Sequence, residues 1–157
     1  MTDAELIEKL KAELGGRVLE TANPAKRRVF IKVGAADLAA AVTALRDSHG
    51  FAHLSTISGV DLGTDFEIVY HFAGPETTVH IRTDIPRQDP HVESITPLIP
   101  GAILYERELQ DMFGIIVDHL PDPRPLVLPD DWPAGDHPLR KDWKFERQPE
   151  IIPGGKS

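Results

Sequence analysis

The sequence has 157 residues, of which 41% are hydrophobic and 27% charged, values typical of one soluble domain with one core. Its formal net charge is −8, whereas proteins that bind nucleic acid usually present a basic face. The one basic run, Lys26-Arg27-Arg28, is more typical of a solvated turn between two strands than of a binding patch. Composition therefore argues against binding to nucleic acid or to an anionic membrane surface.

The sequence contains no cysteine, which excludes disulfides, cysteine-bound zinc and cysteine-bound iron–sulfur clusters within this chain. If the protein belongs to an electron-transfer complex, the metal centres must lie in other subunits. No apolar run approaches the ~20 residues that a membrane-spanning helix needs. Residues 1–5 are acidic and unlike a signal peptide, so we expect a cytoplasmic chain that reaches a membrane only through a partner.

The first half of the chain alternates between helical and extended patterns. Residues 2–14 form a short amphipathic helix that ends at Gly15-Gly16. Two extended segments follow, 17–21 and 28–33, and Asn23-Pro24 between them indicates a turn. The next helix covers residues 35–49, because Leu38, Val42 and Leu45 form one apolar stripe and Gly50 ends it.

Three predicted strands come next, at residues 51–62, 65–72 and 77–85. Apolar and polar side chains alternate along the second and third of them, and short links join all three. This pattern predicts an antiparallel meander with one face exposed to water. Residues 92–99 then have the pattern of one or two helical turns, and residues 102–113 that of a further helix closed by Gly114.

Regular patterns end at Pro121, since eight of the fourteen prolines lie between Pro121 and Pro153. Large apolar side chains continue in this segment, Trp132 and Trp143 among them, and a disordered linker seldom carries so much apolar surface. We therefore expect an extended arm, residues 121–157, that is ordered against its own domain or a partner. The predicted fold of residues 1–120 is α+β, a mostly antiparallel sheet with helices packed on one face.

Two stretches are rich in charged side chains. In the first, Glu106 and Glu108 lie roughly 200° apart around a helix, too divergent for an acid/base pair. Arg107 and Asp111 are four residues apart and can form an ion pair. By spacing alone this stretch is an ordinary charged helix.

The second stretch is His137-Pro138-Leu139-Arg140-Lys141-Asp142. Pro138 makes His137 extended, and the guanidinium of Arg140 suits a carboxylate on this chain or on a neighbour. By itself this stretch is most simply a solvent-exposed charge cluster.

No catalytic motif accompanies these stretches. The seven histidines lack the spacing of a zinc hydrolase site, although His71 and His80 can meet across a hairpin as a surface pair. A small hydrolase that uses Asp118 and His119 is an alternative, but nothing near them in sequence completes such a site.

Taken together, the two charged stretches resemble the 30 kDa-type subunit of respiratory complex I, the bacterial NADH–quinone oxidoreductase. The family pattern of Glu-Arg-Glu followed by Asp-Met-Phe-Gly-Ile stands at residues 106–115, and His-Pro-Leu-Arg-Lys-Asp stands at residues 137–142. Residues 66–71 and 90–95 also look like the family, so the resemblance covers roughly residues 50–145. Residues 118–125 depart from it, because the glycine and the second arginine of the family's Gly-His-Pro and Arg-Arg pattern are absent.

The resemblance implies a cofactor-free structural subunit in the peripheral arm of a membrane-anchored, ion-translocating oxidoreductase. Its partners would be a hydrogenase-like (49 kDa-type) large subunit and a small iron–sulfur subunit. Iron–sulfur clusters, and a nickel–iron centre, flavin or quinone where the complex uses one, would be bound there, on the cytoplasmic face of the membrane. The parent complex, of the NADH–quinone or the group 4 energy-converting hydrogenase type, stays open. A free-standing interaction module is a further alternative.

The same resemblance implies which residues contact the partners. They belong to the two charged stretches: Glu106, Arg107, Glu108, Asp111, Phe113, Gly114, His137, Pro138, Leu139, Arg140, Lys141 and Asp142.

Overall fold

The computed structural model describes residues 1–145, so residues 146–157 of the predicted arm lie outside the described part. Short 3-10 turns at Gly15–Arg17, Ala35–Asp37 and Pro100–Ala102 precede longer elements. The helices and strands, in chain order, are α1 (Asp3–Leu14), β1 (Val18–Ala25), β2 (Arg28–Val33), α2 (Leu38–Asp47), β3 (His53–Asp61), β4 (Asp65–Ala73), β5 (Thr78–Pro86), β6 (His91–Glu93), α3 (Ile103–Phe113) and β7 (Ile116–Asp118).

The first helix and the first hairpin follow the predicted pattern with one difference. Thr2 and Glu5 form a reciprocal cap at the start of α1, which satisfies two backbone N–H groups that have no partner within the helix. The turn between β1 and β2 lies at residues 26–27 and not at Asn23-Pro24. Arg27 adopts φ 66°, so the basic run forms the exposed turn expected from the sequence.

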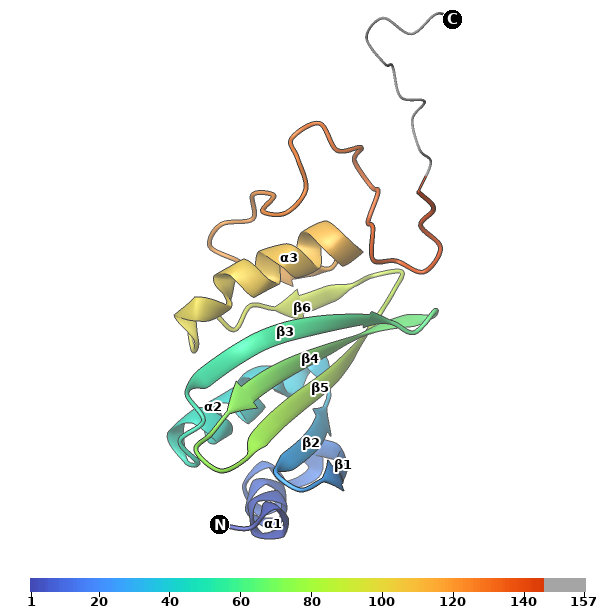
Figure 1. The fold of residues 1–157 in the computed structure, drawn as a ribbon. Coiled ribbons are helices and arrows are strands. Elements are labelled where there is room, and N and C mark those ends of the chain that lie inside the picture. The colour runs from blue at the N-terminus through green and yellow to red at the C-terminus, as the bar shows by residue number, and fades with distance from the viewer. Residues whose placement is uncertain (146–157) are drawn as a thin grey trace, which may run out of the picture.

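Five strands form the main sheet in the order β1-β2-β5-β4-β3 (Figure 1). Strands β3, β4 and β5 pair antiparallel and confirm the predicted meander. The N-terminal hairpin joins it through a parallel pair, β2 with β5, in which Ile31 lies opposite Ile81. The sheet is therefore mixed, although mostly antiparallel.

The core lies against one face of this sheet. Along β4 the side chains of Phe66, Ile68, Tyr70 and Phe72 are fully buried on that face. Helix α1 contacts β1 and β2, α2 contacts β5, and α3 lies along β3, with the irregular segment looping over α3 (Figure 1). None of the helices within residues 1–145 combines the length and apolar character that crossing a lipid bilayer requires.

The prediction of helical turns at residues 92–99 is wrong for its first part. Residues 91–93 form β6, which pairs parallel with β7, and only one turn follows, where the Ile99 N–H donates to the Ile95 carbonyl. The helix does not start earlier because the polar groups of Ser94 and Ile95 bind a side chain of α3. Pro97 and Pro100 also interrupt any longer helix.

Candidate functional site

Helix α3 uses the first acidic residue of its charged stretch inside the domain. The Glu106 side chain is 1% exposed, and its two oxygens accept hydrogen bonds from the Ser94 hydroxyl and the Ile95 N–H, each 2.7 Å long. Burial raises the pKa of the Glu106 carboxyl, and the two hydrogen bonds oppose that shift. Glu106 therefore fastens the turn after β6 to α3.

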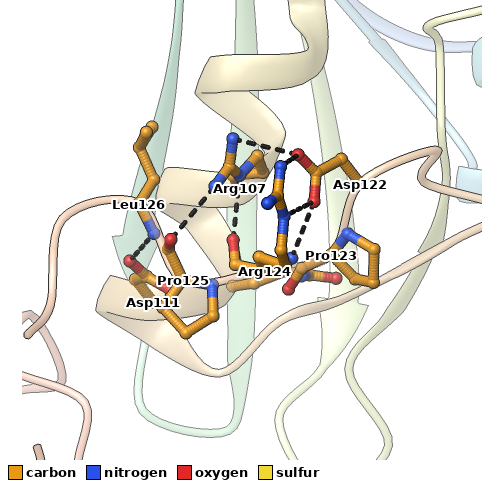
Figure 2. A network of polar contacts seen from close by, with 8 residues as sticks. Arg107, Asp111, Asp122, Pro123, Arg124, Pro125 and Leu126 are labelled. Carbon is orange, nitrogen blue, oxygen red and sulfur yellow. Dashed lines mark hydrogen bonds and ion pairs between the residues drawn. The ribbon is translucent and has the colours of Figure 1, made fainter. Parts of the chain in front are cut away.

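Arg107, the next residue, points toward the arm. Its guanidinium donates to the carbonyls of Arg124 and Pro125 at 2.8 and 3.0 Å, and it lies 3.4 Å from an Asp122 carboxylate oxygen (Figure 2). Five donors in a planar fork suit this set of acceptors, which spans several residues of irregular backbone. Arg107 thus holds the start of the arm against the helix.

Asp111 holds the segment that follows. One oxygen of its carboxylate accepts three consecutive backbone N–H groups, from Leu126, Val127 and Leu128, at 2.8, 2.7 and 3.1 Å (Figure 2 shows the first). Successive amides that converge on one anion form a strong, charge-assisted site. The ion pair expected between Arg107 and Asp111 does not form, because both side chains bind the arm instead.

The end of α3 is capped by the second charged stretch. Gly114 takes the left-handed conformation, φ 69°, that stops a helix and leaves its last carbonyls without helical partners. The carbonyls of Asp111, Met112 and Phe113 accept hydrogen bonds from the His137 ring, the Leu139 N–H and the Arg140 Nε–H, at 2.9, 3.0 and 2.6 Å. A carbonyl only accepts, so the His137 Nδ1 carries the proton.

Charge and space both fit this cap. A guanidinium at the carboxyl end of a helix faces the negative end of the helix dipole. Gly114 is also a spatial requirement, since a Cβ at this position would collide with the His137 ring and lie 2.7 Å from the Arg140 Nη2. The two charged stretches, 23 or more residues apart in sequence, therefore form one unit in space.

A third group ties the arm to the end of β3. Asp61 accepts hydrogen bonds from the Arg87 guanidinium, from the Lys141 N–H at 2.9 Å and from the Gly63 N–H at 2.9 Å. Burial by itself raises the pKa of the Asp61 carboxyl, but these donors outweigh it and lower the pKa to about 2. Arg87 also pairs with Asp142 at 2.6 Å.

Aromatic rings complete the contact between the arm and the domain. The guanidinium groups of Arg87 and Arg140 lie 5.2 and 5.3 Å from the centre of the Phe66 ring, within the range of cation–π attraction. The Phe113 ring meets Phe66 edge-on at 5.9 Å and lies against Gly59, where a Cβ would overlap it. Asp61, Phe66 and Arg87 thus belong to the site, although no motif in the sequence indicated them.

The twelve predicted contact residues divide into three groups by exposure. The side chains turned into the domain are those of Glu106, Asp111 and Phe113. Half-buried residues hold the arm: Arg107, Gly114, His137, Pro138 and Arg140. The residues that face solvent are Glu108, Leu139, Lys141 and Asp142. Their contact with a partner stays a prediction.

Comparison with known proteins identifies the family. Residues 31–149 match the family described as "Respiratory-chain NADH dehydrogenase, 30 Kd subunit". The chain belongs to this family. The resemblance noted in the two charged stretches is thereby confirmed.

Relatives of the chain within this 30 kDa family come from more than one type of complex. An NADH-quinone oxidoreductase subunit of a Nocardioides species is 37% identical over 127 residues, 76% of this chain and 50% of that protein. Hydrogenase-4 component G of Escherichia coli is 61% identical over 49 residues, 31% of this chain and 9% of that protein. The chain spans about half the length of the Nocardioides relative.

The family fold is also found in a solved structure, that of the membrane-bound sulfane sulfur reductase, an archaeal respiratory membrane complex. One chain of it matches with a TM-score of 0.73 and 22% identity, over 90% of this chain and 85% of that chain. This likeness shows a shared fold.

The exposed apolar side chains of this family member cluster around the same unit. Ten large apolar side chains are exposed within residues 1–145, and six of them come from α3, β7 or the arm. These six are Leu104, Ile116, Leu126, Val127, Leu139 and Phe145. Exposed apolar side chains gathered in one region are typical of a protein–protein contact surface.

The alternative hydrolase site gains no support from the geometry. Asp118 lies 2.9 Å from the His91 Nδ1, whereas the His119 Nδ1 lies 2.6 Å from Glu93. The two residues are thus engaged with different partners and do not converge on a common point. No group of three or more acidic, histidine or cysteine side chains within the described residues is arranged to hold a metal ion.

His71 and His80 do meet, on the face of the sheet opposite the core. Their Nδ1 atoms are 2.7 Å apart, and the outer ring nitrogens contact the hydroxyls of Ser58 and Thr78 at 3.0 and 3.2 Å. One Nδ1 must donate and the other accept, so the contact needs at least one neutral ring. Partial burial, the neighbouring His71 ring and Arg28 together lower the pKa of His80 to about 4, and burial lowers that of His71.

This pair predicts a pH dependence of stability. The unfolded chain takes up protons at these positions near pH 6.5, and the folded chain only at lower pH, so the free energy of unfolding falls as pH decreases from about 6.5 to about 4. We expect a loss on the order of 1 kcal/mol, since partial exposure weakens the effect. Urea unfolding across this range measures it. His80→Gln should flatten the slope and the exposed-site control His53→Gln should not; equal slopes in all three proteins would contradict the assignment.

Proposed function

We propose that this chain is a structural subunit of the peripheral arm of a complex I-like, membrane-anchored, ion-translocating oxidoreductase. In this proposal it packs on a hydrogenase-like (49 kDa-type) large subunit, next to a small iron–sulfur subunit. The observation that carries the proposal is the fixed arm: the motif side chains hold it against α3, while Leu126, Val127 and Leu139 face outward. Family membership supports the assignment to this class of complex.

The proposal gives the motif residues two roles. The buried and half-buried ones, such as Asp111 and Arg140, shape the arm from inside. The solvent-facing ones, Glu108, Leu139, Lys141 and Asp142, touch the partner together with the exposed apolar side chains. Substitutions in either group would then weaken assembly, the first by deforming the surface and the second by removing contacts from it.

The redox chemistry belongs to the partners in this proposal. They bind the iron–sulfur clusters and any nickel–iron centre, flavin or quinone, and this chain binds none. The complex has either NADH–quinone oxidoreductase or group 4 hydrogenase character, and both types are represented among the relatives. The chain would lie on the cytoplasmic face of the cell membrane and be attached to it through the other subunits.

Affinity purification from native membranes tests the proposed function. With a tag on this chain and mild detergent, we expect a hydrogenase-like large subunit and an iron–sulfur subunit to co-purify, and mass spectrometry identifies which parent complex they form. The separately produced chain should contain neither metal nor flavin in stoichiometric amount. Recovery without those subunits would instead support a free-standing interaction module, and a stoichiometric cofactor would contradict the structural role.

Truncation after residue 120 tests the proposed division into a domain and an arm. The cluster of buried core side chains extends to Leu120, and none of its described members comes from the arm. We therefore expect residues 1–120 to fold, with a Tm several degrees lower because Asp61, Asp111 and the end of α3 lose their partners. Far-UV circular dichroism measures folding, and co-purification measures assembly, which should be lost. An unfolded product would show that the arm is part of the core.

A further inference from the structure

The arm forms an open depression of about 700 Å³ on its outer side. Its apolar walls are Trp132, Trp143 and Phe145, and Arg140, Lys144 and His137 are among its polar lining. The two indole rings lie 6.0 Å apart at an angle of 29°, and Phe145 lies 6.2 Å from Trp143. A depression of this size accommodates a short peptide segment rather than one side chain.

The walls are built by local hydrogen bonds. The Trp132 indole N–H donates to the Asp136 carbonyl at 2.9 Å, and a turn joins the Trp132 N–H to the Pro129 carbonyl. The Trp143 N–H likewise closes a turn on the Arg140 carbonyl at 3.1 Å. Both indoles are thus positioned before anything enters the depression.

Arg140 places an uncompensated positive charge at this depression. Its Nε–H donates to the Phe113 carbonyl, and it shares the Phe66 ring with Arg87. The two carboxylates nearest to this pair, Asp61 and Asp142, both form their ion pairs with Arg87. None of the carboxylates within residues 1–145 forms an ion pair with Arg140. A half-buried cation without a counter-charge is unfavourable, and an arriving carboxylate would remove that cost.

We propose that the depression receives a segment of a partner subunit that carries an Asp or Glu side chain paired with Arg140 and apolar neighbours packed on Trp132, Trp143 and Phe145. Lys144, on the rim, adds a second positive charge that favours the same occupant. The guanidinium fork of Arg140 offers a carboxylate two parallel hydrogen bonds, which also sets its orientation. This inference rests on the proposed function and adds the chemistry of the partner at one place.

Zero-length cross-linking in the purified complex tests this pairing. A carbodiimide joins a lysine amine to a carboxylate only when the two are in direct contact. With Arg140→Lys, we expect an amide bond between position 140 and an Asp or Glu of another subunit, identified by mass spectrometry of the cross-linked peptides. Arg124→Lys is the matched control, because Arg124 lies in the same arm but pairs with Asp122 of its own chain at 2.7 Å. It should therefore couple within the chain.

Two outcomes would overturn the proposal. In one, position 140 couples to a carboxylate of its own chain, such as Asp142, Glu146 or Glu150; in the other, it does not couple while the Arg124→Lys control does. If Arg140→Lys does not assemble, the unmodified complex decides, since Lys144 should couple to an acidic residue of another subunit and its failure to do so counts against the proposal. Co-purification of the subunits without these cross-links would refute this inference and leave the proposed function intact.

Discussion

Replacing Gly114 by alanine is expected to release the arm from α3 while the rest of the domain stays folded. Alanine at φ 69° costs roughly 1–2 kcal/mol by itself. Its Cβ would also collide with the His137 ring, which is held in place by a 2.9 Å hydrogen bond to the Asp111 carbonyl. Since the ring has no free rotation to make room, we expect a total loss of roughly 2–4 kcal/mol from the docking of the arm.

Tryptophan fluorescence reports this loss selectively, because both tryptophans, Trp132 and Trp143, belong to the arm. In Gly114→Ala the emission should shift to longer wavelength and its urea transition should move to lower concentration, while far-UV circular dichroism changes little. Gly101→Ala is the control, since a Cβ at Gly101 meets nothing within 4 Å and its φ is not positive. Coincident fluorescence and dichroism transitions in Gly114→Ala would show that the arm and the domain unfold as one unit.

Replacing Asp111 by alanine is the second change with a large expected effect. The side chain is 8% exposed, and one of its oxygens accepts three backbone N–H groups of the arm. Hydrogen bonds to a charged acceptor contribute about 1.5–3 kcal/mol each, but released amides recover bonds to water. We expect a net loss of about 2–3 kcal/mol in Asp111→Ala and a smaller one in Asp111→Asn, measured by the same fluorescence transition.

A double-mutant comparison separates arm docking from the helix itself. In the chain truncated after residue 120 the three amide donors are absent, so Asp111→Ala should no longer change stability by more than a few tenths of a kcal/mol. The exposed-site substitution Asp130→Ala controls for the loss of a negative charge in the full chain. An equal effect of Asp111→Ala in the long and the short chain would mean that its role lies within α3.

Local patterns predicted the secondary structure well where a segment packs on one side only. Alternation along residues 65–72 and 77–85 predicted β4 and β5, because one face of the sheet is buried and the other is not. The parallel pairing of β2 with β5 was not predictable. It joins segments about 50 residues apart, and no turn between neighbours specifies it. The start of residues 92–99 was predicted wrongly because a side chain of α3 satisfies its polar groups.

The site was predictable as a pair of motifs but not as a structure. Spacing on a helix gave Arg107 and Asp111 to each other, the nearest charges in sequence. The fold offers each a better partner in the arm: carbonyls for the guanidinium and amides for the carboxylate. Asp61 and Arg87 carry no local signal, since their importance comes from the approach of Lys141 and Asp142 across more than 50 residues.

The arm is attached to its own domain at several points before any other subunit arrives. A segment that orders only on binding loses conformational entropy at that moment, which lowers affinity and adds a folding step to association. Asp111, the end of α3 and Asp61 have already fixed residues 126–141 in place. Association can then proceed as the docking of a finished surface, and its heat-capacity change should reflect the apolar area covered rather than the folding of a chain.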